Sequence, residues 1–204
     1  MSISSSIVER IISLQKSRLA SLAFFYCDFR EDQKKDVRGL LSSWLLQLSR
    51  QSHLYCDILS NLYLEHDNGS REPSEGTLVR CLKEILKLPG QPPVYLIIDA
   101  LDECPITTSL SPPRDRVLML VAELIDSQVP NLRICVTSRP ETEIKALLSP
   151  LTFRSISLHD ESGQMEDINN YITFVVNTDQ MMRKWKTADK QLVIEVLTNK
   201  ADGM

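Results

Sequence analysis

Glycine is scarce in this 204-residue chain, and none of its six glycines is followed by a lysine. The sequence therefore contains no phosphate-binding loop of the form G-x-x-x-x-G-K-[ST], and it lacks the backbone N–H groups and the lysine that such a loop offers to a triphosphate. Basic residues form no concentrated stripe, and the formal net charge is −4. Both features argue against a nucleic-acid partner.

Other absences concern membranes, metals and disulfides. No apolar run approaches the roughly 18 residues that span a bilayer, so we expect no membrane partner. The first residues lack the basic and long apolar segments of a secretory signal. The five cysteines show no C-x-x-C spacing, and His53, His66 and His159 are scattered. We therefore expect reduced thiols without a zinc site, and a cytoplasmic protein.

Apolar runs alternate with segments of helical periodicity along most of the chain. This alternation predicts an α/β fold with a parallel sheet flanked by helices. After His159 only helical patterns remain, so we expect an α/β core over residues 1–160 and the start of a helical subdomain over 161–204. The expected strands are 19–28, 94–99, 132–137 and 153–158; the expected helices are 4–17, 37–48, 54–64, 74–86, 117–124, 141–148, 167–185 and 188–200.

Acidic residues end the most apolar of these strands. Asp99 follows a run of buried-strand type, and Asp102 and Glu103 come three and four residues later. Ligands of open α/β sheets collect at the carboxyl ends of the strands. Asp99 is therefore a candidate ligand for Mg²⁺, and Asp102 or Glu103 could polarise an attacking water.

A basic residue follows the next strand. Arg139 lies in Thr-Ser-Arg-Pro at 137–140, at the end of the strand after the acidic motif, where a cation could sense or stabilise a γ-phosphate. Asp28 closes the first strand, and there a carboxylate that caps the loop is the simpler interpretation.

Four ordered motifs together resemble a known family. They read FFYCDFR at 24–30, VRGLLSSWLLQL at 37–48, LIIDALDEC at 96–104 and RICVTSRPE at 133–141. They resemble the NACHT domain of fungal NOD-like receptor proteins, a STAND-class P-loop NTPase, and most closely its nephrocystin 3-like N-terminal type. The resemblance implies that Asp99 is the Walker B acid, that Asp102 and Glu103 are the acids after it, and that Arg139 is the sensor 1 arginine.

One departure from this family bears on function. In the family, a first strand and a glycine-rich loop precede the helix that residues 4–16 resemble, and that strand lies between those at 132–137 and 153–158. We therefore expect a P-loop NTPase-like fold that lacks its first strand and P-loop, with a gap beside 153–158 or a poorly anchored final strand. Intact relatives bind Mg-ATP, whereas we expect no bound cofactor and no hydrolysis here.

Three functional interpretations remain open. The first is a truncated NACHT-type signalling module. The second is a non-enzymatic interaction module whose helical surfaces bind a full-length relative or another partner. A missing central strand would also leave unpaired edges, so we expect self-association and marginal stability. The third is a Mg²⁺-dependent phosphoesterase or nuclease that uses Asp28, Asp99 and Asp102; the lack of basic residues near these acids counts against a nucleic-acid substrate.

Overall fold

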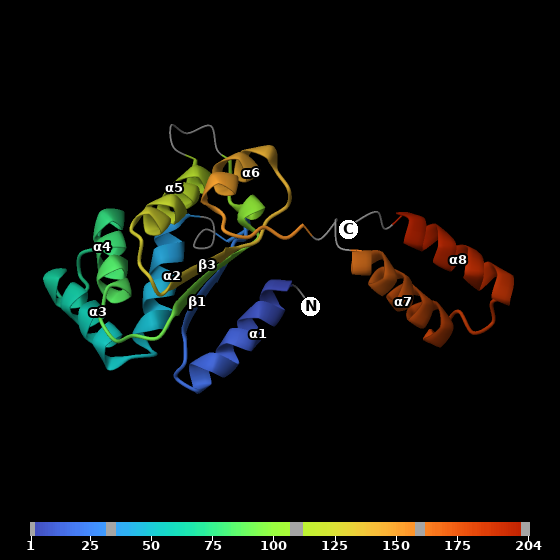
Figure 1. The fold of residues 1–204 in the computed structure, drawn as a ribbon, viewed down its shortest axis with the longest axis horizontal. Helices are drawn as coiled ribbons and strands as arrows, with labels where there is room; N and C mark the ends of the chain where they lie inside the picture. Colours follow the sequence, from blue (N-terminus) through green and yellow to red (C-terminus); the bar gives the residue numbers. More distant parts are fainter. Residues whose placement is uncertain (1–2, 32–35, 107–111, 158–161, 201–204) are drawn as a thin grey trace. The chain divides into compact units, whose positions relative to one another are not determined.

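The structure of the chain is a computed structural model that describes residues 3–31, 36–106, 112–157 and 162–200 (Figure 1). The chain divides into two compact units, Met1–Thr152 and Phe153–Met204. The first holds an α/β core and the second a pair of helices. No helix among the described residues is long and apolar enough to cross a membrane.

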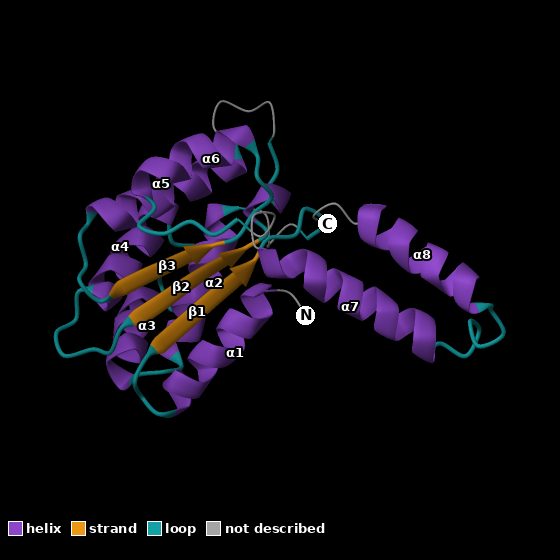
Figure 2. Cartoon of the chain, turned by 45° about the vertical axis from the view of Figure 1, so that its right-hand side comes forward, coloured by secondary structure: helices purple, strands orange, loops and turns teal. Residues whose placement is uncertain are grey.

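A three-stranded parallel sheet forms the centre of the first unit (Figure 2). The strands β1 (Ser21–Tyr26), β2 (Val94–Asp99) and β3 (Leu132–Val136) lie in the order β1-β2-β3. Tyr26 pairs with Asp99 and Ile98 with Val136, so all three strands end on one edge of the sheet. The predicted parallel sheet flanked by helices is confirmed, with a first strand shorter than the predicted 19–28.

Helices follow the predicted order, with differences at their ends. They are α1 (Ile3–Lys16), α2 (Val37–Ser49), α3 (His53–Glu65), α4 (Glu75–Leu86), α5 (Pro113–Asp126), α6 (Thr142–Leu148), α7 (Ser162–Thr178) and α8 (Thr187–Lys200), with short 3₁₀ turns η2 (Leu101–Glu103) and η3 (Ser149–Leu151). The helix predicted to run to Trp185 ends at Thr178. Asp179 explains this early end, because its side chain accepts a hydrogen bond from the backbone N–H of Met181 and so favours a turn.

The fourth predicted strand is absent. Residues 153–157 form no strand, and Leu158 lies outside the described residues. Phe153 is fully exposed and Ile156 is 60% exposed. A β-strand is stabilised by its ladder and by burial of one face, and this segment has neither. The prediction of a fourth strand was wrong for residues 153–157, and so was its form as a poorly anchored final strand.

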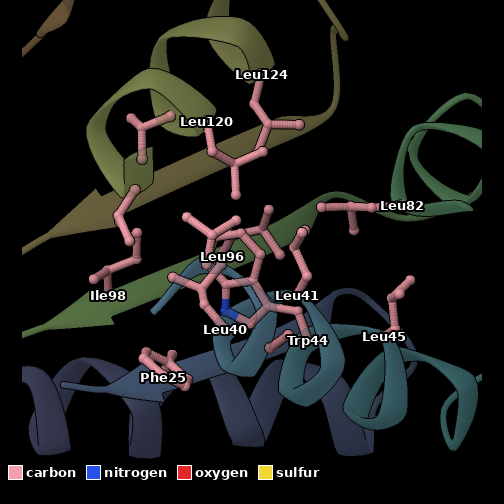
Figure 3. Packing of buried hydrophobic residues seen from close by; sticks show 14 of the residues in the cluster. Phe25, Leu40, Leu41, Trp44, Leu45, Leu82, Leu96, Ile98, Leu120 and Leu124 are labelled. Atoms are coloured by element: carbon pink, nitrogen blue, oxygen red, sulfur yellow. The ribbon is translucent and has the colours of Figure 1, made fainter. Parts of the chain in front are cut away.

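Apolar side chains cover both faces of the sheet. The larger cluster lies between one face and helices α2, α4 and α5, with Trp44 at its centre (Figure 3). A smaller cluster packs Val8 and Ile11 of α1 against Leu22 and Ile97 on the other face. Trp44 is fully buried, and its Nε1 has no hydrogen-bond partner within the described structure. These helices hold the strands rigidly and so position the residues that follow them.

Two glutamine side chains form hydrogen bonds with main-chain groups of β1 that point away from β2. The Gln51 amide accepts a hydrogen bond from Leu22 N at 2.9 Å and donates one to Leu22 O at 2.5 Å. Gln47, one helical turn earlier on α2, makes the same pair of bonds to Phe24 at 3.0 and 2.7 Å. Because the two amides occupy the positions of a neighbouring strand, this edge of the sheet is closed to other chains.

Candidate functional site

A strained turn connects the end of β2 to the acidic residues Asp102 and Glu103. Ala100 has φ 55° and ψ 49°, the left-handed conformation that residues other than glycine avoid. Thr137 holds this turn in place, since its Oγ1 accepts a hydrogen bond from Ala100 N at 3.1 Å and its carbonyl accepts one from Leu101 N at 3.0 Å. Non-glycine residues in this conformation persist where their surroundings over-determine them, often at functional sites.

The same threonine also contacts Asp99. Its hydroxyl donates a hydrogen bond to Asp99 Oδ1. Asp99 ends β2 and is half-buried. The second oxygen of this carboxylate remains as the atom that could reach a cation.

The structure brings Asp102 and Arg139 together. Asp102 Oδ1 accepts a hydrogen bond from Arg139 N at 3.0 Å, and Asp102 Oδ2 lies 3.4 Å from Arg139 Nε. The Asp102 side chain is 10% exposed, whereas the Arg139 side chain is 84% exposed. The expected placement of acids and arginine at one sheet edge is therefore confirmed as geometry.

Arg114 supports the turn that carries Asp102 and Glu103, a role that the sequence pattern does not indicate. This arginine of α5 is buried, and its guanidinium donates to the carbonyl oxygens of Asp102 and Cys104 and to the carboxylate of Glu141. A buried guanidinium requires several such acceptors. Nothing in the local sequence distinguishes Arg114 from a surface residue at a helix start, because its partners lie in other elements.

Asp28 does not join the other acids. Arg30 donates from N and Nε to Asp28 Oδ1 and from its Nη2 to Asp28 Oδ2, so the carboxylate caps its own loop as predicted. This hydrogen bonding to Asp28 raises the pKa of Arg30. Among the described residues no group of three His, Cys, Asp or Glu side chains is placed to hold a metal ion. The phosphoesterase interpretation needs Asp28, Asp99 and Asp102 together, and it stays a prediction.

The donor set at this edge fits a Mg-ATP site only in part. Mg²⁺ is usually held by one or two carboxylates together with substrate phosphates and waters, and Asp99 could supply one such carboxylate. The phosphate side needs backbone N–H groups and a lysine, and the sequence has no loop of that kind. The residues present do not complete the site.

Cys27 and Cys104 lie beside the turn that carries Asp102 and Glu103. The sulfur atoms of the two cysteines are close enough to hydrogen bond. This contact raises the pKa of the Cys27 thiol, to which burial also contributes. The same contact, helped by the charge of Arg114, lowers the pKa of the Cys104 thiol.

A family model described as "Nephrocystin 3, N-terminal" matches residues 2–139. The chain belongs to this nephrocystin 3 N-terminal family. The match includes β1, β2 and β3 and ends at Arg139, so every residue of the candidate site lies within it. No curated protein and no solved structure shows a significant match to the chain.

Proposed function

We propose that this member of the nephrocystin 3 N-terminal family is a NACHT-type signalling module that neither binds nor hydrolyses ATP with these 204 residues alone. In this proposal Asp99 corresponds to the Walker B acid that holds Mg²⁺. Asp102 and Glu103 correspond to the acids that polarise water, and Arg139 corresponds to the sensor 1 arginine. These roles rest on the resemblance of the motifs and on the position of these residues after β2 and β3, which end on the same edge of the sheet.

The observation that carries the proposal is the absence of a phosphate-binding loop from the sequence. The solvent-exposed pairing of Arg139 with Asp102 does not itself prevent this arginine from turning toward a phosphate. Nothing in the sequence replaces the phosphate loop. Each charge-assisted hydrogen bond contributes about 1.5–3 kcal/mol, so the loss of several lowers nucleotide affinity by orders of magnitude.

Calorimetry with Mg-ATP tests this proposal. We expect no measurable binding and no phosphate release from the wild-type chain, and the same result for Asp99→Asn. Asp126→Asn, at the end of α5 and away from the site, is the matched control for the charge change. Micromolar binding that Asp99→Asn abolishes and Asp126→Asn leaves intact would refute the proposal.

The open edge of β3 favours a second function, an interaction module for other protein chains. Beside β3 the described residues provide β2 on one side and no strand on the other. Thr137 N donates to Ile98 O, and Val94 N donates to Asn131 O. Every second residue of this segment therefore directs its main-chain N–H and C=O toward β2. Ile134 lies between such residues, so its main-chain groups point to the open edge. Exposed edges of this kind pair with other strands. We propose a second copy of this chain, or a relative with the complete domain, as the cytoplasmic partner.

A further inference from the structure

Cys27 and Cys104 lie 77 positions apart in the sequence, yet their Sγ atoms are 3.2 Å apart. Cys27 follows β1, and Cys104 follows the turn η2 that carries Asp102 and Glu103. The backbone of Cys27 is also bound to the last residue of β2, since Cys27 N donates to Asp99 O at 3.0 Å. Both side chains are buried, at 4% and 1% exposure, and both thiols are free.

We propose that Cys27 and Cys104 form a reversible oxidation site, at which a peroxide converts the two thiols into an intramolecular disulfide. The sulfur atoms of a disulfide lie about 2.05 Å apart, so the pair has to close by only about 1.2 Å. The two cysteines are positioned by a strand end and by a turn that Thr137 and Arg114 hold in place. The reacting atoms are therefore pre-positioned, which favours an intramolecular bond over reaction with another chain.

The reaction balances with hydrogen peroxide as the oxidant. One sulfur attacks a peroxide oxygen, the O–O bond breaks, and a sulfenic acid and water form. The second sulfur then displaces the sulfenic oxygen as a second water. In total two S–H bonds and one O–O bond are lost, and one S–S bond and two water molecules form. A dithiol reductant restores the thiols by exchange.

The disulfide would fix the acidic turn to the end of β1. Residues 99–104 are held at present by hydrogen bonds to Thr137 and Arg114, which local opening can break. A covalent link to Cys27 removes that freedom and also constrains the unfolded chain over a long loop. The oxidised protein should therefore melt at a temperature roughly 5–10 °C higher.

The other three cysteines provide the contrast. Cys56 is exposed on α3, and its Sγ lies 4.0 Å from the hydroxyl of Ser60. Cys81 is buried in the large apolar cluster, and Cys135 lies on β3. Among the described residues, Cys27 and Cys104 are the two thiols in contact with one another. Oxidation of Cys56 therefore serves as the measure of non-specific reaction.

The test treats the full chain with hydrogen peroxide and maps its peptides without reduction. We expect a Cys27–Cys104 linked peptide, a fall from five to three thiols that can be alkylated in denaturant, and recovery of all five with dithiothreitol. Cys27→Ser and Cys104→Ser should each lose the linked peptide and the rise in melting temperature. Cys56→Ser should retain both.

Peptide mapping of the wild-type chain tests for the Cys27–Cys104 disulfide even if a serine variant fails to fold. If Cys27 and Cys104 stay alkylatable while Cys56 is oxidised, the proposal is wrong. It is equally overturned if the linked peptide joins two different copies of the chain, or if the melting temperature rises as much in Cys104→Ser as in the wild type.

Discussion

Asp102 accepts a hydrogen bond from the backbone N–H of Arg139 at 3.0 Å, and the second carboxylate oxygen of Asp102 lies 3.4 Å from Nε of the same arginine. One side chain thus joins the turn after β2 to the segment after β3. The hydrogen bond to Arg139 N holds the main chain of the segment after β3. The contact between Asp102 and the exposed guanidinium of Arg139, by contrast, is open to solvent. The two contacts should contribute differently to stability.

Substitution of Asp102 separates these two contributions. Asp102→Asn keeps an oxygen that can accept from Arg139 N and removes only the ion pair with the exposed guanidinium of Arg139, so the free energy of unfolding should change by less than about 0.5 kcal/mol. Asp102→Ala removes the acceptor as well and should cost about 1 kcal/mol. Urea unfolding of the three proteins measures the difference. An equal loss in both variants would mean that the charge matters more than the backbone contact.

Gln47 on α2 and Gln51, just beyond the end of this helix, give a second prediction. Gln51→Ala removes the acceptor of Leu22 N and the donor to Leu22 O, and it should lower the free energy of unfolding by about 1–2 kcal/mol. Hydrogen exchange at the Leu22 amide should become faster while exchange at the Phe24 amide, held by Gln47, stays slow. Ser42→Ala, at an exposed position of the same helix, is the control. Unchanged exchange at Leu22 would show that water replaces the amide without loss.

Those glutamines also show where sequence reasoning ends. The run at 94–99 predicted β2 well, because a strand buried in the core leaves a continuous apolar signal, and the shorter run at 132–137 predicted β3 although its residues are only partly buried. Parallel strands end on one edge, so the placement of Asp102 and Arg139 at that edge could be predicted too. Arg114, Gln51 and the pair of cysteines could not, since each acts on an element far away in the sequence. The segment 153–158 has the composition of a strand, but its described residues 153–157 pair with none of the described strands.

The open edge of β3 gives a third prediction. If copies of the chain pair through this edge, Ile134→Pro should abolish self-association, because proline removes the outward N–H without breaking the bonds to β2. Ile134→Ala is the matched control, since it also shortens the side chain but keeps the N–H. Sedimentation velocity at several concentrations compares them, after circular dichroism has shown that both are folded. Association of the proline variant at wild-type strength would exclude this edge as the contact.

Cys81 makes stability depend on alkaline pH. Burial raises the pKa of its thiol to about 11, from 9.0 for an unperturbed cysteine, with a smaller contribution from the charge of Glu84. Well below pH 9 the thiol is protonated in both the folded and the unfolded chain, so it causes no pH dependence there. Between pH 9 and 11 the unfolded chain loses this proton first, and the free energy of unfolding falls as the pH rises.

A raised pKa of this size corresponds to about 2–3 kcal/mol by pH 11. Burial also raises the pKa of Tyr55 and of Cys135, so the wild-type slope contains several groups of the same sign. The difference between the wild type and Cys81→Ala isolates one of them. Urea unfolding at pH 8.5, 9.5 and 10.5 should give a shallower decline for Cys81→Ala, whereas Cys56→Ala, at an exposed position, should follow the wild type. Parallel declines in all three proteins would show that Cys81 is not ionised on unfolding in this range.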